Sequence, residues 1–334
     1  MNSKHVNAME VARSAGVSQS TVSRVFTPGS NVSARARKKV LEAANELGYR
    51  PNALARGLIK NKTNMIGLVM GDIKNPFYPE ILEKFTKGLQ EKGFQVLFVQ
   101  TANEEIQQEE ITQFFEYNVA GVIVTDAKLS SNVVTRLSDK DIPVILFNRY
   151  TKDSSCHFVC CDNYLAGREI ARYLAAKGHK QCAFIAGKTN TSTSMDREKG
   201  FKEGLKEIQA DLTAEHGDFT YEGGYKAALK LLNSLNPPDA IFCANDIMAL
   251  GALDAAKSLG IQIPKQLSII GFDDIGMASW PPYMLTTWQQ PVDTMVQLTI
   301  DHLIDEIKNG DRGPVALLLQ GSLIERDSVS TFIK

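Results

Sequence analysis

The chain lacks the short motifs that commonly mark an enzyme. It contains no phosphate-binding loop, no Gly-x-Gly-x-x-Gly fingerprint, no His-Glu-x-x-His pair and no nucleophile elbow. We therefore expect no catalytic residues and no cofactor. A sugar-modifying α/β enzyme remains as an alternative without a supporting group of residues.

Cysteines are few, and their number is odd, which favours neither a disulfide framework nor a metal centre. In a reducing cytoplasm they are expected to be small buried hydrophobes, mostly in strands. His157, Cys160 and Cys161 are close in sequence, but neighbouring side chains of a strand point to opposite faces, so we predict no metal site. The five cysteines are Cys156, Cys160, Cys161, Cys182 and Cys243.

Long apolar runs, low-complexity tracts, short internal repeats and a signal-peptide pattern are also missing. No membrane segment is therefore expected. A periplasmic receptor would need an export signal, whereas this chain begins with a basic helical pattern. We expect a cytoplasmic protein.

Charge is unevenly distributed along the chain. Residues 1–62 hold 11 Lys and Arg against 3 Asp and Glu, whereas all 334 residues hold 37 against 38. A small basic head therefore precedes a larger acidic body. This asymmetry indicates that the head binds nucleic acid.

The head pattern predicts two short helices joined by a three-residue turn. The first ends at Gly16, and Ser18 is expected to cap the second. Their inward residues are Met9, Val11, Ala12, Ala15, Val22, Val25 and Phe26. The outer face of the second helix carries Gln19, Ser20, Ser23 and Arg24. Such polar side chains can pair with base edges when the second helix of a helix-turn-helix enters the major groove.

A third helix is expected between its N-cap Ser33 and Gly48. Its predicted packing residues are Val40, Leu41, Ala44 and Leu47. Its first turns carry phosphate-binding candidates, namely Arg35, Arg37, Lys38 and Lys39. A three-helix bundle with a solvated basic face is the alternative to a DNA-binding head.

Residues 53–60 predict a short helix that is too short to be stable alone. Asn52 can cap it, and Leu54 and Leu58 share one face. An exposed Leu58 would fit a wedge that opens a minor-groove base step. A plain linker is the alternative.

The head and the segment after it resemble the lactose-repressor (LacI/GalR) family. The resemblance rests on Glu10-Val-Ala-Arg-Ser-Ala-Gly-Val-Ser-Gln-Ser-Thr-Val-Ser-Arg-Val25 and Gly48-Tyr-Arg-Pro-Asn-Ala-Leu-Ala-Arg-Gly-Leu58, and it continues to about residue 327. Glu10 departs from the family, which usually has Asp there. By this resemblance the DNA-contact residues are Ser18, Gln19, Ser20, Thr21, Arg24, Asn52, Ala55 and Leu58, with Leu58 as the wedge.

The body alternates apolar strands with helical stretches, which is typical of parallel sheets covered by helices on both faces. Expected strands are 65–70, 95–99, 121–125, 144–147, 158–161, 183–185, 240–243 and 267–271. Expected helices include 79–92, 106–117, 165–177 and 248–259. About 270 residues exceed one typical core, so two α/β subdomains are predicted.

Polar residues follow many of these strands, where open parallel sheets bind ligands. A pocket rich in Asp, Asn and Arg with aromatic faces suits the paired hydroxyls of a sugar. These polar residues can also have purely structural roles. Asp162 and Asp246 can be helix N-caps, and Arg197 can be a surface residue.

The resemblance extends to the body, which is similar to periplasmic sugar-binding proteins. It implies effector contacts at Asn148, Arg149, Asp162, Arg197, Phe219, Asn245 and Asp273, with Phe77 and Trp280 as stacking faces. It also implies a head (1–48), a hinge helix or linker (49–63) and a body (64–334). The body would comprise an N-subdomain of about 64–161 and 293–321 and a C-subdomain of about 162–292 and 322–334.

The fold class is therefore α/β, with a three-helix helix-turn-helix head and a periplasmic-binding-protein-like body of two doubly wound parallel-sheet subdomains. The predicted function is a homodimeric transcriptional repressor that binds a palindromic operator. A small molecule, expected to be a sugar or sugar derivative, would control it by shifting populations of two states, and a purine or nucleoside effector is the alternative. Some family members carry a leucine-heptad tail that forms tetramers, and its absence here favours a dimer.

Overall fold

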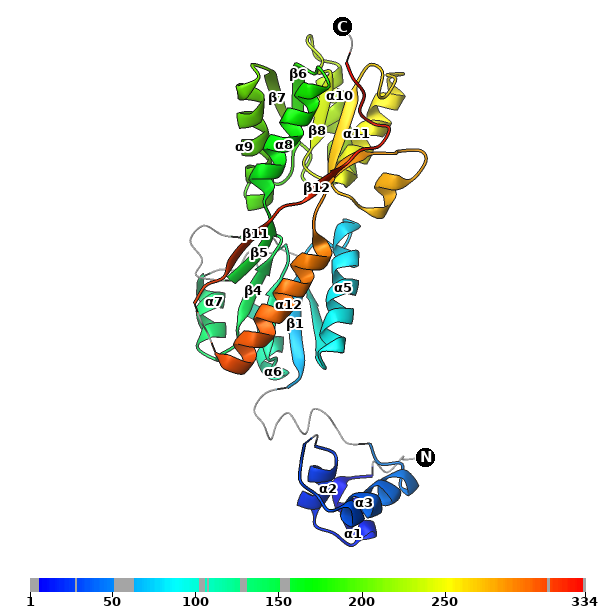
Figure 1. Cartoon of the computed structure of the whole chain (residues 1–334), viewed down its shortest axis with the longest axis vertical. Coiled ribbons are helices and arrows are strands. Elements are labelled where there is room, and N and C mark those ends of the chain that lie inside the picture. The colour runs from blue at the N-terminus through cyan, green and yellow to red at the C-terminus, as the bar shows by residue number, and fades with distance from the viewer. Residues whose placement is uncertain are drawn as a thin grey trace. The chain divides into compact units, whose positions relative to one another are not determined.

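The computed structural model describes residues 6–27, 29–50, 63–101, 106, 108–126, 131–150, 157–310 and 313–332. The chain divides into two compact units, Met1–Thr63 and Asn64–Lys334, called here the head and the body (Figure 1). The expected hinge helix at 53–60 lies outside the described residues. Within the described ranges, no helix has both the length and the apolar character needed to cross a membrane.

The described part of the head forms α1 (Ala8–Ala15), α2 (Gln19–Val25) and α3 (Ala34–Glu46). The predicted N-caps are confirmed, since the Ser18 and Ser33 hydroxyls accept backbone N–H groups at 3.2 and 3.3 Å. Asn7 caps α1, and Glu10 completes a capping box by accepting the Asn7 N–H at 3.0 Å. Glu10, where the chain departs from the family pattern, therefore helps to start the first helix.

The head core uses one face of each helix, and three of the residues predicted for it are exposed instead. Its buried residues are Val11, Ala12, Ala15, Val22, Val25, Val40, Ala43 and Ala44. Met9, Leu41 and Leu47 were wrongly predicted to be inside, because they are 58%, 46% and 38% exposed. In α3 the buried positions follow i, i+3 and i+4 spacing, and Leu41 is turned away from them by about 100°.

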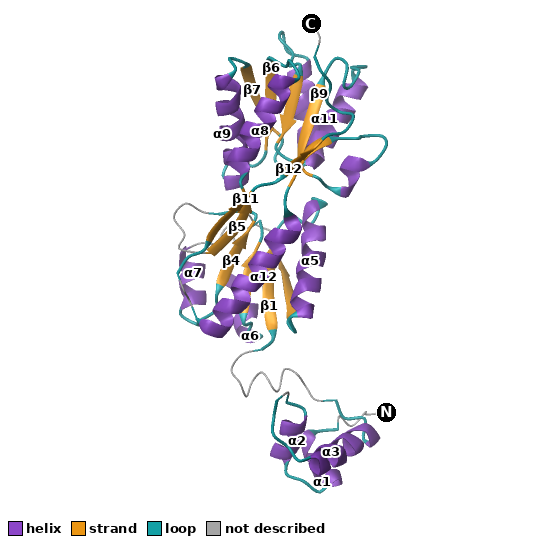
Figure 2. Ribbon diagram, in the orientation of Figure 1, coloured by secondary structure: helices purple, strands orange, loops and turns teal. Residues whose placement is uncertain are grey.

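The described strands of the body form two sheets, which define its N-lobe and C-lobe (Figure 2). The N-lobe order is β11-β5-β4-β3-β1-β2, and the C-lobe order is β12-β10-β9-β8-β6-β7. The N-lobe strands are β1 (Met65–Met70), β2 (Gln95–Gln100), β3 (Gly121–Val124), β4 (Val144–Phe147), β5 (His157–Cys161) and β11 (Ala316–Leu319). The C-lobe strands are β6 (Gln181–Ala186), β7 (Asp211–His216), β8 (Ala240–Cys243), β9 (Ser268–Asp273), β10 (Thr286–Gln289) and β12 (Ser322–Ile324).

Helices cover the sheets as the strand–helix alternation predicted. The N-lobe carries α5 (Phe77–Glu91), α6 (Gln108–Glu116), α7 (Ser131–Ser138) and α12 (Val292–Asn309). The C-lobe carries α8 (Asn163–Ala176), α9 (Ser192–Glu207), α10 (Tyr221–Leu232), α11 (Asp246–Ser258) and the short η1 (Gly276–Ser279). The α/β class is confirmed. One described strand departs from the parallel arrangement, because β12 pairs antiparallel with β10.

The N-lobe sheet has two buried faces, and its strands alternate between them with a period of two residues. Ile66 and Leu68 of β1 pack in the same cluster as α5 and α12, whereas Val69 packs with α6 and α7. In the described chain, the lobes are joined at 161–162, 290–291 and 320–321. The described cysteines, Cys160, Cys161, Cys182 and Cys243, are buried as predicted.

Two glycines bring α8 and α9 together, and α9 carries Arg197. A Cβ atom on Gly200 would lie 2.0 Å from the Tyr164 carbonyl oxygen, and one on Gly167 would lie 2.4 Å from the Arg197 carbonyl oxygen. Glycine at these positions therefore allows the close approach of the two helix backbones.

Replacing Gly200 with alanine should lower the free energy of unfolding by about 1–3 kcal/mol, because backbone atoms must move apart. Denaturant unfolding would measure this change. Gly276→Ala is the matched control, since nothing lies within 4 Å of a Cβ there. Equal stability of the two variants would contradict the packing argument.

Candidate functional site

The body encloses a polar cavity of about 230 Å³ at the carboxyl ends of strands from both lobes. It is lined by Gly71, Asp72, Asn75, Phe77, Tyr78, Thr101, Asp126, Asn148, Arg149, Lys188, Thr193, Arg197, Asp218, Phe219, Thr220, Asn245 and Asp273. The cavity is smaller than the range of about 300–1,000 Å³ typical of drug-sized ligands. Its size and lining suit a small polar compound.

In the N-lobe wall, the Asp126 carboxylate already has hydrogen-bond partners within the protein. Its carboxylate accepts the Gly71 and Asp72 N–H groups, each at 2.6 Å, and the Thr125 hydroxyl at 2.9 Å. Arg149 donates to the Asp126 carbonyl oxygen. Asp126 therefore holds the loop after β1 and orients Arg149 toward the cavity.

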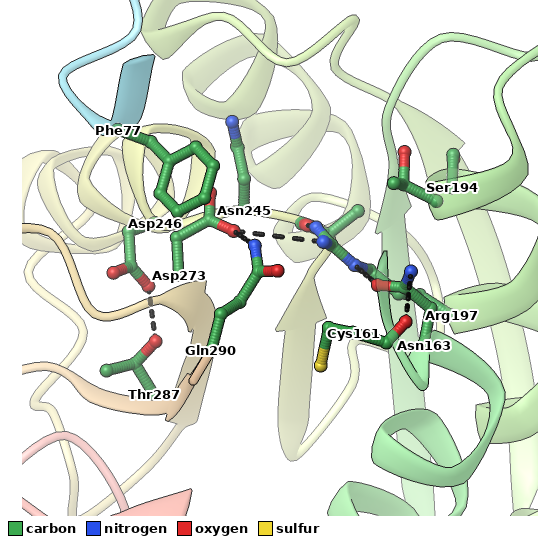
Figure 3. A network of polar contacts seen from close by, with 12 residues as sticks. Phe77, Cys161, Asn163, Ser194, Arg197, Asn245, Asp246, Asp273, Thr287 and Gln290 are labelled. Carbon is green, nitrogen blue, oxygen red and sulfur yellow. Dashed lines mark hydrogen bonds and ion pairs between the residues drawn. The ribbon is translucent and has the colours of Figure 1, made fainter. Parts of the chain in front are cut away.

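In the C-lobe wall, Arg197 is held by groups from three segments. Figure 3 shows Arg197 with Asn163 and Asp273 beside it. Its Nε donates to Asn163 Oδ1 at 2.8 Å, and its NH1 donates to the Ala244 carbonyl at 2.5 Å. Its guanidinium carbon lies 3.4 Å from the centroid of the Phe272 ring. Burial lowers the pKa of Arg197, and the nearby Asp273 opposes that shift. The guanidinium is thus fixed before any ligand arrives.

Asp273 faces Arg197 across the floor of the cavity. Its Oδ1 lies 3.8 Å from Arg197 NH2 and accepts Gln290 Nε2 at 2.8 Å. The backbone φ of Asp273 is 114°, a strained value that the surrounding structure must maintain. Burial raises the pKa of its carboxyl to about 6, although Arg197 lowers it. Asp273 can therefore change charge near neutral pH.

Asp246 lies beside this site but belongs to the core. It is fully buried and accepts the Thr287 hydroxyl at 2.6 Å (Figure 3). It also accepts the Ile275 N–H at 2.9 Å. Burial raises its pKa well above the usual value, and the Asp273 carboxylate adds to this. Asp246 therefore supports the loop after β9 rather than lining the cavity.

Two buried amide atoms in the lining have no hydrogen-bond partner within the described residues, namely Asn148 Oδ1 and Asn245 Nδ2. Asn245 Oδ1 accepts the Met248 N–H at 3.1 Å as the cap of α11, which leaves Nδ2 as the free donor. Buried polar atoms normally have partners. The cavity therefore offers a free acceptor on one lobe and a free donor on the other.

The structure brings together seven of the nine predicted effector residues. Phe77, Asn148, Arg149, Arg197, Phe219, Asn245 and Asp273 line the cavity. Asp162 does not, because its carboxylate caps α8 by accepting the Leu165 N–H at 2.9 Å. Trp280 does not either, because it follows η1 and is 52% exposed.

Sequence reasoning did not select several lining residues, including Tyr78, Thr101, Lys188, Thr193, Asp218 and Thr220. Asp218 and Thr220 follow β7, an edge strand. Its polar sequence, Asp-Leu-Thr-Ala-Glu-His, does not predict a strand. Thr193 lies within the polar stretch Thr189–Ser194, and the composition of that stretch was the available signal. Tyr78 is buried, and burial raises the pKa of its hydroxyl.

The described part of the head exposes most of the predicted base-contact residues. Ser18, Gln19, Ser20 and Arg24 are exposed on or beside α2, whereas Thr21 is half-buried and its hydroxyl bonds to Ser18 at 2.9 Å. Arg37, a predicted phosphate ligand, instead donates to the Val25 carbonyl at 3.1 Å. Asn52, Ala55 and Leu58 lie outside the described residues.

Known proteins resemble this chain along nearly all of its length. The family described as "Bacterial regulatory proteins, lacI family" matches residues 9–52, and "Periplasmic binding protein domain" matches residues 66–278. The HTH-type transcriptional repressor PurR of Yersinia enterocolitica is 32% identical over 327 residues, covering 96% of each chain.

Solved structures agree with these sequence matches. The lac repressor dimer bound to operator and the anti-inducer ONPF has a TM-score of 0.87 at 27% identity, covering 98% of this chain and 100% of that one. The transcriptional regulator CelR in complex with cellobiose has a TM-score of 0.71 at 29% identity, covering 97% and 99%. A regulator from Enterococcus faecium with bound ribose has a TM-score of 0.73 at 25% identity, covering 80% and 100%. With its helix-turn-helix head and two-lobed body, this chain belongs to the LacI family of bacterial transcriptional regulators.

Proposed function

We propose that the protein is a dimeric cytoplasmic repressor that binds a palindromic operator through its head. A small polyhydroxylated compound, a sugar or sugar derivative, binds in the cavity of the body and changes the affinity for DNA. The lac repressor dimer bound to operator supports the dimer and the DNA partner. The hinge segment, including Leu58, would complete the DNA contact.

One observation carries the sugar assignment. The cavity combines a free amide acceptor, a free amide donor, a fixed guanidinium and a buried carboxylate, contributed by Asn148, Asn245, Arg197 and Asp273. Neighbouring hydroxyls of a sugar both donate and accept, so they can satisfy such mixed groups together. The relatives with cellobiose and ribose support the same class.

A purine or nucleoside is the second candidate. Phe77 and Phe219 line the cavity, and aromatic faces of this kind can stack on a base. The similarity to PurR favours it as well. Calorimetric titration with monosaccharides, disaccharides, purine bases and nucleosides separates the candidates, because binding confined to one set selects that class.

The DNA function is tested by incubating the full chain with fragmented genomic DNA at moderate salt and sequencing what is retained. We expect enrichment of a short palindrome. Retention of DNA without a shared palindrome would contradict specific operator binding. The genes beside an enriched palindrome would narrow the effector to their substrates.

Replacing Arg24 with alanine should weaken binding to the selected operator by at least about tenfold, because each good base contact contributes about 1–3 kcal/mol. Fluorescence anisotropy at fixed salt would measure the change. Arg13→Ala, on the exposed side of α1, removes an equal charge as the control. If both variants lose affinity equally, Arg24 acts only through general attraction to phosphates.

A further inference from the structure

Tyr150 lies in the connection after β4 of the N-lobe, yet two of its groups bond to α9 of the C-lobe. Its backbone N–H donates to the Ser192 hydroxyl at 3.1 Å. Its hydroxyl donates to Asp196 Oδ2 at 2.5 Å. These three residues are called here the interlobe contact.

The tyrosine ring is itself held in place on the N-lobe side. It stacks on Phe158 of β5, with ring centroids 5.0 Å apart and planes 23° from parallel. Burial, and then the Asp196 carboxylate, raise the pKa of the Tyr150 hydroxyl, so it remains a hydrogen-bond donor at neutral pH. The contact therefore joins a ring that is packed on β5 of one lobe to a helix of the other.

The interlobe contact runs beside the cavity without lining it. Ser192 and Asp196 are four residues apart on α9 and share one side of that helix. Thr193 and Arg197, each one residue further along, line the cavity. On the other lobe, Arg149 lines the cavity and directly precedes Tyr150.

We infer that Tyr150 is a positioning residue that stabilises the closed arrangement of the lobes and so holds Arg149 opposite Thr193 and Arg197. This deepens the proposed function, because closing the lobes completes the effector site. The contact biases the equilibrium between open and closed lobes even when no small molecule is bound. A residue that makes a contact in the closed state and not in the open state shifts the population toward the closed state.

The test measures lobe separation directly and needs neither effector nor operator. Spin labels are attached through Glu116→Cys on the N-lobe and Lys206→Cys on the C-lobe, both exposed positions. Labelling of the unsubstituted chain gives the background from native cysteines. Pulsed dipolar spectroscopy on the full chain then gives the distribution of distances between the lobes.

Tyr150→Phe removes only the hydroxyl and keeps the ring on Phe158. We expect the distance distribution to shift toward longer separations, and Asp196→Ala to give a similar shift. Combining the two changes should add little, because both remove the same hydrogen bond. Tyr164→Phe is the matched control, since the Tyr164 hydroxyl donates to Glu203 within the C-lobe.

An unchanged distribution in Tyr150→Phe and Asp196→Ala would overturn the inference, as would an equal shift in Tyr164→Phe. Circular dichroism on each variant shows whether it is folded. Because this measurement uses the unliganded chain, its failure is distinguishable from failure of the proposed sugar assignment. A compound that titration finds to bind should also bind about tenfold more weakly to Tyr150→Phe, although Tyr150 itself does not line the cavity.

Discussion

Arg197→Ala should abolish the response of operator binding to any compound that the cavity takes, and it should also destabilise the fold. Arg197 is only 2% exposed, and its removal leaves the Asp273 carboxylate without its cationic neighbour and Asn163 Oδ1 without a donor. Removing one partner of a buried ion pair typically costs about 3–5 kcal/mol. Because Asp273 can bind a proton instead, the destabilisation should be at the lower end of that range and smaller at acidic pH.

Denaturant unfolding and operator anisotropy, with and without the compound found by titration, measure the two effects. Arg172→Ala is the control, because that side chain is 46% exposed in its ion pairs with Glu169 and Glu207. Such exposed pairs contribute about 0–1 kcal/mol. A normal response in Arg197→Ala would show that the effector binds elsewhere, whereas loss of operator binding without any compound would show that the change damages more than the cavity.

Asp273→Asn should remove a pH dependence of stability that the wild type shows between about pH 4 and pH 7. Burial raises the carboxyl pKa from 3.8 to about 6, so the folded protein binds the proton more tightly than the unfolded chain does. The folded state is thus favoured at low pH, and that contribution is lost as the pH rises through about 6. The difference corresponds to about 3 kcal/mol.

Unfolding free energies at several pH values from 4 to 7, for wild type and variant, check this prediction. The gap between the two curves should grow in favour of Asp273→Asn as the pH rises. Asp211→Asn, an exposed position, controls for the removal of one carboxyl group. Curves that stay parallel across this range would mean that Asp273 titrates alike in the folded and unfolded states.

The helix-turn-helix could be predicted almost completely, because its signals are local. Ser18 and Ser33 cap helices through atoms three residues away, and Gly16 and Gly48 adopt the left-handed conformation that ends a helix. The errors at Met9 and Leu41 arose from counting apolar residues without deciding which side of each helix is covered. That choice depends on the neighbouring helices.

In the body, every internal strand except β10 was predicted, whereas β2 was the one described edge strand that was predicted. β1, β3, β4 and β8 are continuous apolar runs because both faces of the sheet are covered. β7 and β12 lie at sheet edges, and their composition carries no such signal. The polar residues Asp218 and Thr220 were missed together with β7.

The amino-acid sequence by itself determined the α/β class, the basic head and the presence of polar residues after the strands, since each follows from spacing along the chain. Only the tertiary structure decided which of those residues face a common cavity. Asp162 directly follows β5 and Asp273 ends β9, yet the first caps a helix and the second faces Arg197. The contact of Tyr150 with Asp196 likewise exists only because the lobes bring together residues 46 positions apart. Long-range packing of this kind leaves no periodic pattern in the sequence.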